Sequence, residues 1–353
     1  MTTIAPLEEH VRALRTTVAL VHHPVGARVL VEGRDAFDVV DALLSTDLFL
    51  RDGQLREALV LDEEGDVELD VVVGRDGESM LLLVEGGDAA HVARLVAAVA
   101  AGRDARAVDL GTTHEVVELH GPYAWELLGV WLGPDLVGLP HLAFERAGEV
   151  LVARAGKTGE YGYHVLLPRH RSAALRAALA GHAPRFAATA VGPSTLALAR
   201  LENGFLDLPA LAPRARDPLE LQLGWRLAHG KSYRGSDALA RRRSLGPRRR
   251  VTWIRAPRAL AAGDAVAAEH EVVGEVVHAA WDPVTASSVG LAMLPRSVAC
   301  AGIEGLEAVA PSGSRCPLRT VSPPLLLNRS LFVSPQRHAF DMRAERVLPE
   351  PWR

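Results

Sequence analysis

Alternating apolar and polar residues predict a β-hairpin in the first quarter of the chain. Apolar side chains occupy every second position from Val67 to Val73, and they follow an acidic turn at residues 62–65. The hairpin is predicted over residues 59–73. Successive side chains of a strand point to opposite faces, so Asp70 falls on the face away from these valines. The pattern alone therefore predicts that Asp70 is exposed to solvent.

Further strands and helices follow from the same periodicities. Strands are predicted from alternating or continuous apolar runs, and helices from apolar residues spaced three or four apart. The predicted strands cover residues 25–33, 80–85 and 115–119, and the predicted helices cover residues 5–20, 34–44, 88–99, 169–179 and 193–203, with one more starting at Gly121-Pro122. This mixture predicts an α+β core over residues 1–240, built from two intertwined αβ subdomains.

The most informative stretch is residues 154–168, Arg-Ala-Gly-Lys-Thr-Gly-Glu-Tyr-Gly-Tyr-His-Val-Leu-Leu-Pro. Glycines at 156, 159 and 162 predict a tight turn, and alternation from Tyr161 to Leu167 predicts a half-buried strand. Gly156-Lys157-Thr158 is not a phosphate-binding loop, because that motif needs a glycine at position 151, which is Leu151. The glycine spacing also differs from that of a dinucleotide-binding fingerprint.

The C-terminal third has a different pattern. Short predicted strands at residues 251–255, 265–270, 272–278, 288–294 and 305–309 alternate with turns, which is typical of a small β-barrel. We assign the barrel to residues 251–330. Residues 241–250 carry six arginines around Gly-Pro, which predicts a solvated linker or, alternatively, a binding site for phosphate or polyglutamate. Residues 331–353 are expected to form a flexible tail or an oligomer arm.

Composition excludes several classes of protein. The net charge of −4 argues against general nucleic-acid binding, which needs a basic face. No apolar run approaches the ~18 residues of a membrane span, and the N-terminal residues lack the pattern of a signal peptide, so a cytoplasmic protein is expected. Two cysteines are too few for a disulfide framework or a thiolate metal site. Neither Gly-x-Ser-x-Gly nor His-Glu-x-x-His is present, so neither serine hydrolysis nor a metal site is expected.

Residues 154–168 resemble the Thr-Gly-Tyr-Thr-Gly-Glu-x-Gly-(aromatic)-Glu signature of the glycine-cleavage T-protein, or aminomethyltransferase, family. Other segments are similar to this family in the same order. They are His-Gly-Pro-Tyr-Ala at 120–124, Arg-Leu-Glu-Asn-Gly at 200–204, the segments 223–225 and 231–239, and the hairpin segments 274–276 and 290–292. The resemblance implies the multi-domain T-protein fold, with folate-binding αβ domains and a C-terminal β-barrel. Ser232 stands where the iron–sulfur assembly branch has a cysteine, which argues against that branch.

The resemblance also implies a set of site residues. Asp70 matches the aspartate that faces the folate in the family, where it is thought to position or protonate the nitrogen that carries the one-carbon unit. It is therefore the predicted catalytic residue. Arg200 matches an arginine near the ligand, and Tyr163 matches the aromatic residue of the signature. These two residues are predicted to shape the folate pocket.

Three positions depart from the family pattern. His164 replaces a glutamate whose carboxylate accepts hydrogen bonds from the pterin, Glu85 replaces an asparagine, and Lys157 replaces a tyrosine. A neutral imidazole offers one acceptor, so Glu85 is expected to supply the missing carboxylate. All three residues are predicted to bind the cofactor, and their joint change predicts either altered ligand recognition or the loss of folate use.

We therefore expect a tetrahydrofolate-dependent one-carbon transferase that acts on folate and a small one-carbon donor or acceptor. The alternative is a non-catalytic protein of the same fold that binds folate or another planar ligand and acts through a protein partner. Neither a nucleic acid nor a membrane is expected as a partner, while a protein partner or a second copy of the chain is compatible with the sequence.

Overall fold

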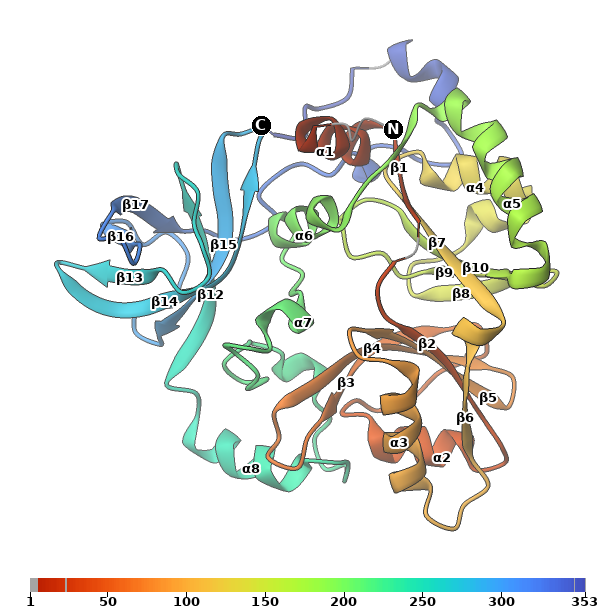
Figure 1. Cartoon of the computed structure of the whole chain (residues 1–353), viewed down its shortest axis with the longest axis horizontal. Helices are drawn as coiled ribbons and strands as arrows, with labels where there is room; N and C mark the ends of the chain where they lie inside the picture. The colour runs from red at the N-terminus through yellow and green to blue at the C-terminus, as the bar shows by residue number, and fades with distance from the viewer. Residues whose placement is uncertain (1–5, 23, 346, 353) are drawn as a thin grey trace.

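The computed structural model describes residues 6–22, 24–345 and 347–352. It contains two β-sheets with flanking helices and a separate closed β-barrel (Figure 1). This arrangement confirms the predicted α+β class and the C-terminal barrel. In the described part of the chain, no helix is both long enough and apolar enough to span a bilayer.

The first sheet is antiparallel throughout and has the strand order β3-β4-β5-β2-β6. One face is covered by two helices, whose apolar side chains form one core with the side chains of alternate strand positions. The predicted hairpin is confirmed, and its first strand begins four residues earlier than expected. The elements are β2 (Ala27–Glu32), α2 (Ala36–Leu43), β3 (Leu55–Leu61), β4 (Val67–Asp76), β5 (Ser79–Glu85), α3 (Ala89–Ala100) and β6 (Arg106–Asp109).

The second sheet has the order β11-β1-β7-β10-β9-β8. The chain enters it at β1 (Val18–His22), leaves to build the first sheet, and returns at β7 (His114–His120). The predicted first helix is too long, because residues 18–20 already belong to β1. The other elements are α4 (Ala124–Leu132), β8 (Ala143–Ala147), β9 (Val150–Arg154), β10 (Gly162–Pro168), α5 (Arg169–His182) and β11 (Ala188–Ala190).

The two sheets pack against each other through a shared apolar core. Leu55, Val72 and Leu83 of the first sheet meet Leu151 and Leu166 of the second. Val72 and Asp70 lie on the same face of β4, so this packing also covers Asp70. The expectation that Asp70 is exposed is therefore wrong. Both faces of the first sheet are covered, and a strand pattern cannot reveal a second covering layer.

The barrel closes through the strand order β12-β15-β14-β13-β16-β17. The last strand was not predicted, because its outward-facing positions are two arginines and a proline. The arginine-rich segment 241–250, predicted as a solvated linker, has regular structure over most of its length, since it is helical up to Leu245 and extended from Arg249. The elements are α8 (Ser236–Leu245), β12 (Arg249–Ala256), β13 (Ala265–Ala268), β14 (Glu271–Asp282), β15 (Ser287–Pro295), β16 (Leu306–Val309) and β17 (Arg315–Thr320).

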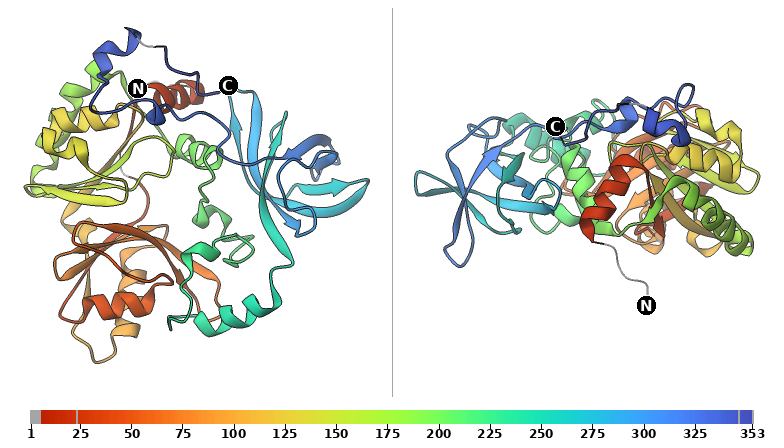
Figure 2. Two further views of the ribbon diagram at one scale, coloured as in Figure 1. Left: turned by 180° about the vertical axis from the view of Figure 1, so that it is seen from behind. Right: turned by 90° about the horizontal axis from the view of Figure 1, so that it is seen from above.

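Two helices lie between the barrel and the second sheet, α1 (Leu7–Thr16) and α6 (Pro193–Glu202) (Figure 2). Arg15 of α1 is fully buried and bonds Glu202 of α6 at 2.6 Å. The short helix α7 (Leu208–Leu211) follows α6 and packs against β4 and β14. Of these helices, α6 brings Arg200 and α7 brings Pro209 to the space beside Asp70.

The C-terminal segment packs back onto the second sheet, so the expected flexible tail is wrong, while the alternative of an oligomer arm stays a prediction. Phe340 is 1% exposed, and its ring meets Tyr123 edge-on at 5.2 Å. Val333 belongs to the same core. The Tyr161 hydroxyl donates a hydrogen bond to the carbonyl of Val333 at 2.9 Å. This segment is therefore a strap that completes the core of the second sheet.

Tyr161 in the glycine-rich turn and Tyr163 in β10 give a matched test of how much the strap stabilises the fold. Tyr161→Phe removes the bond to Val333 and is expected to cost about 1 kcal/mol of unfolding free energy. Tyr163→Phe removes a buried hydroxyl that has no hydrogen-bond partner among the described residues, so no loss of stability is expected. Urea unfolding of both variants measures the difference. Equal losses in the two variants would contradict the role of the Tyr161 bond.

Candidate functional site

Asp70 lies at the centre of a buried cluster of charged residues between the two sheets. Its side chain is 1% exposed. Oδ2 accepts a hydrogen bond from Lys157 Nζ at 2.9 Å, and Oδ1 accepts one from Arg226. The Arg226 side chain also donates to the carbonyl of Ala58, at 2.6 Å, so it connects Asp70 to the neighbouring strand β3.

The charge state of Asp70 follows from these partners. Burial by itself raises the pKa of Asp70, but Lys157 and Arg226 outweigh it and lower the pKa to about 2. The carboxylate is therefore ionised at neutral pH. A proton-donor role needs a protonated carboxyl and does not fit this geometry, whereas a role through negative charge does.

Lys157 is one of two lysines in the chain, and its ammonium contacts three carboxylates. Besides Asp70, Nζ lies 3.1 Å from Glu85 Oε1 and 3.9 Å from Glu57 Oε1. Burial lowers the pKa of Lys157, but the three carboxylates raise it above its ordinary value. The ammonium therefore stays protonated and is unsuited to act as an amine nucleophile.

The glycine-rich turn explains how Lys157 reaches this position. A Cβ on Gly156 would lie 2.5 Å from the Cα of Gly162, so both positions need glycine for the two arms of the turn to meet. Gly159 at the tip has a φ of +78°. The turn thus closes tightly and directs Lys157 toward β4. The sequence predicted the turn. It could not predict the contact between Lys157 and Asp70, because these residues are far apart in the chain.

Glu85 and Arg200 belong to the same cluster. Glu85 stands opposite Asp70 in the pairing of β4 with β5. Its Oε2 lies 3.0 Å from Arg200 Nη1, and its Oε1 lies 3.1 Å from Lys157 Nζ. Both oxygens are thus engaged with cations. The proposed use of Glu85 as a pterin acceptor stays a prediction, and it requires these ion pairs to open.

Tyr163 and His164 point to opposite faces of β10. Tyr163 is fully buried in the core of the second sheet, as the alternation predicted, and this placement argues against a contact with ligand. His164 Nδ1 lies 2.7 Å from Glu118 Oε1. Of the six predicted site residues, four therefore come together directly, namely Asp70, Glu85, Lys157 and Arg200.

His164 belongs to a second buried cluster around Glu118, which the sequence reasoning missed. Glu118 Oε2 lies 3.2 Å from His120 Nε2, and Oε1 lies 3.6 Å from Arg28. Burial raises the pKa of Glu118, but His164 and His120 outweigh it and hold that pKa well below its ordinary value. Glu118 and His120, two residues apart at the end of a predicted strand, were the signal that could have identified this cluster.

Two small pockets, each of about 210 Å³, flank Asp70. One is lined by Glu85, Pro209 and Arg216 among others. The other has Glu57 and Lys157 at one side and three aromatic side chains, Phe205, Trp225 and Trp253. Trp225 is 70% exposed, which is unusual for a tryptophan and marks the open side of this pocket. We call it the aromatic pocket.

Glu57 is the carboxylate of the aromatic pocket that sequence reasoning missed. It lies in β3, two residues before the predicted start of the hairpin strand. Its nearest cation among the described residues is Lys157, at 3.9 Å, so its oxygens are less engaged than those of Asp70 or Glu85. In the part of the chain that the structure describes, no group of histidine, cysteine and acidic residues is arranged to hold a metal ion.

Comparisons with known proteins agree with this fold. The family model of the GCVT N-terminal domain matches residues 3–231. The aminomethyltransferase of Frankia alni is 31% identical, with 91% of this chain and 88% of that protein covered. The aminomethyltransferase of Rubrobacter xylanophilus is 30% identical, with 81% of this chain and 78% of that protein covered.

A solved structure has the same overall fold. The glycine cleavage system aminomethyltransferase T from Bartonella henselae superposes with a TM-score of 0.80 at 21% identity, covering 90% of this chain and 89% of that one. The chain therefore belongs to the GCVT aminomethyltransferase family and is an enzyme of the one-carbon group transferase class.

Proposed function

We propose that this enzyme transfers a one-carbon unit to or from tetrahydrofolate at the aromatic pocket beside Asp70. The observation that carries the proposal is the buried, ionised Asp70 carboxylate at the wall of a pocket that also offers aromatic side chains and a second carboxylate. Family membership supports the reaction class, and the pocket supports a planar, hydrogen-bonding substrate.

The residues of the aromatic pocket fit a pterin. A pterin has a flat ring for contact with Phe205, Trp225 and Trp253, and it has adjacent N–H donors for a carboxylate such as Glu57. A volume of about 210 Å³ suits a ring system rather than a whole drug-sized ligand, for which about 300–1,000 Å³ is usual. The rest of a folate would therefore extend past the exposed Trp225.

Each charged residue has a distinct role in this proposal. Tetrahydrofolate would supply the nitrogen that carries the one-carbon unit. Asp70 would stabilise positive charge that develops during transfer, since a fixed charge in a buried site acts strongly on the transition state. Lys157 and Arg226 hold Asp70 ionised and in place. Glu85 pairs with both Lys157 and Arg200 and thereby links these two cations beside Asp70.

Calorimetric titration with 5-formyltetrahydrofolate tests the proposal. The wild-type enzyme is expected to bind it, and Glu57→Gln is expected to weaken binding by about 10- to 150-fold, the range for a hydrogen bond to a charged group. Glu63→Gln, at an exposed acidic residue of the neighbouring turn, should bind like the wild type. Absence of binding by the folded wild-type enzyme at millimolar folate would reject folate as the substrate.

A further inference from the structure

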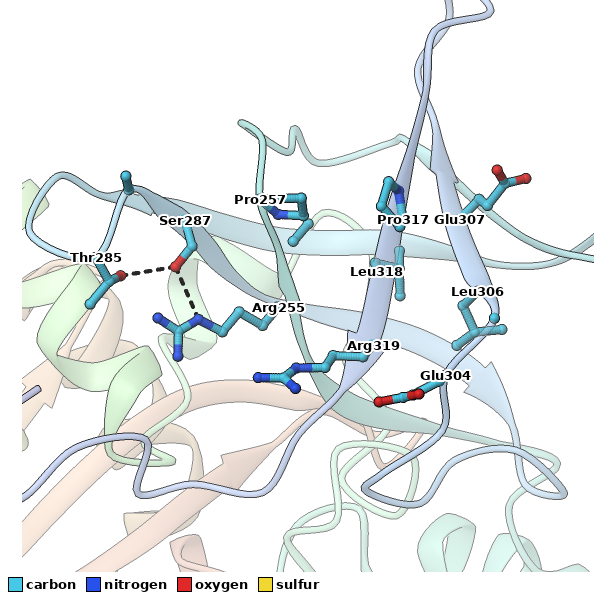
Figure 3. A pocket seen from close by; sticks show the side chains of 13 residues that line it. Arg255, Pro257, Thr285, Ser287, Glu304, Leu306, Glu307, Pro317, Leu318 and Arg319 are labelled. Carbon is cyan, nitrogen blue, oxygen red and sulfur yellow. Dashed lines mark hydrogen bonds between the residues drawn. The ribbon is translucent and has the colours of Figure 1, made fainter. Parts of the chain in front are cut away.

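A cavity of about 710 Å³ lies on the barrel, at the point where β12 and β17 separate. Its wall includes Arg255 from β12, Arg319 from β17, and the hydroxyls of Thr285 and Ser287 in the turn that leads into β15 (Figure 3). None of these residues belongs to the clusters around Asp70 or Glu118. The cavity is much larger than either pocket beside Asp70.

The two arginines form an unusual pair. Arg255 and Arg319 stand directly opposite each other on antiparallel strands. Like charges at such positions destabilise a sheet, so they are expected only where something compensates for them. Arg255 is half-buried and Arg319 is exposed, and among the described residues neither guanidinium lies within ion-pair distance of a carboxylate.

Neighbouring groups orient Arg255 toward the cavity. Its Nε donates a hydrogen bond to Ser287 Oγ at 3.0 Å, which fixes the side chain and leaves the two terminal nitrogens without a hydrogen-bond partner among the described residues. Figure 3 shows both guanidinium groups on the side of Thr285 and Ser287, with the Glu307 carboxylate at the other end. Glu307 is neutralised by Arg315. The Glu304 carboxylate also lines the cavity, and Figure 3 draws it nearer to the Arg319 guanidinium than to Glu307.

We infer that this cavity binds an anion that carries a carboxylate or phosphate group, held by Arg255 and Arg319. A guanidinium presents planar, paired donors that match both kinds of group. The Thr285 and Ser287 hydroxyls lie on the same side and add polar contacts. A bound anion supplies the negative charge that the arginine pair lacks.

The anion has two candidate sources with the same chemistry. One is a free small molecule, and the other is the far end of the ligand in the aromatic pocket. The second source has a structural argument. Ile254 and Ala256 point into the barrel interior, so Trp253 and Arg255 share the outer face of β12. Trp253 lines the aromatic pocket, and Arg255 is two residues further, about 7 Å along the strand. Assignment to a ligand tail rests on the proposed folate function, whereas the anion site does not.

Calorimetry with γ-triglutamate and with pyrophosphate at low ionic strength tests the anion site. At least one of these anions is expected to bind the wild-type enzyme, and Arg255→Ala and Arg319→Ala are each expected to weaken that binding by about tenfold or more. Arg249→Ala is the matched control, because Arg249 lies on the same strand but pairs with Glu220. Thermal unfolding of each variant verifies that it is folded. If no anion binds, or if both cavity variants bind like the control, the inference is wrong.

A second titration distinguishes the two sources. Triglutamyl 5-formyltetrahydrofolate should bind the wild-type enzyme more tightly than the monoglutamyl form if the anion is a ligand tail, and Arg319→Ala should abolish this preference. An equal affinity for both forms, together with binding of a free anion, assigns the site to a free small molecule. Free-anion binding without any folate binding would reject the proposed function and keep the anion site.

Discussion

Asp70→Asn is expected to lower the rate of one-carbon transfer by about 10²- to 10³-fold, the usual loss when one electrostatic group of a preorganised site is removed. Asparagine keeps the shape of the side chain but removes the negative charge that Lys157 and Arg226 hold between the two pockets. Affinity for 5-formyltetrahydrofolate should change little, because both Asp70 oxygens already bond protein groups. The measurement is the initial rate at saturating tetrahydrofolate, beside calorimetric affinity.

Asp76→Asn is the matched control for this prediction. Asp76 ends the same strand and bonds Arg146 near the surface, so its variant should keep wild-type turnover. A folded Asp70→Asn enzyme with unchanged turnover would exclude the role of Asp70 in catalysis. A large loss of folate affinity with unchanged turnover would instead make Asp70 a binding residue.

The pH dependence separates the two roles that the family resemblance left open for Asp70. Its folded pKa is depressed to about 2, below the ordinary value of a free aspartate. The stability that its ion pairs contribute is therefore present above the unfolded pKa and is lost as the pH falls through the folded value. Asp70 should contribute no titration step to the rate between pH 5 and 8. A step in that range that disappears in Asp70→Asn would restore the proton-donor role.

Much of the fold could be predicted because local patterns determine it. The hairpin of β3 and β4, the face of β10 that carries Tyr163, and most barrel strands follow from alternation that depends on immediate neighbours. The environment of Asp70 could not be predicted in this way. Its strand pattern is that of a half-exposed sheet, and only the packing of the second sheet, nearly 100 residues further along the chain, covers that face.

The candidate site shows the same limit at the level of single charges. Resemblance identified the position of Lys157 as a departure, but it could not show that the ammonium bonds Asp70, the residue expected to face the ligand. It also could not show that both Glu85 oxygens meet cations, whereas Glu57 has a single cation, Lys157, at 3.9 Å. Such differences depend on distances of one or two ångströms between segments that are remote in sequence.

Lys157→Met is expected to destabilise the fold by about 3–5 kcal/mol, the usual cost of removing one partner from a buried ion pair. Methionine fills a similar volume, but it leaves Asp70 and Glu85 with fewer cations in a buried site. Denaturant unfolding at pH 7 measures the loss. Arg12→Met, which breaks the exposed pair with Glu8, should cost less than about 1 kcal/mol and serves as the comparison.

The pH dependence of the Lys157→Met variant gives this prediction a second, independent readout. Without the ammonium, burial becomes the stronger influence and the pKa of Asp70 is expected to rise. A carboxyl whose folded pKa lies above its unfolded value destabilises the protein while it is ionised, so the variant should regain stability relative to the wild type as the pH falls from 7 toward 5. A cost that is large but independent of pH would point to lost packing instead. A cost near that of Arg12→Met would show that Arg226 and Arg200 suffice to neutralise the cluster, and Lys157 would then be available to act on the ligand.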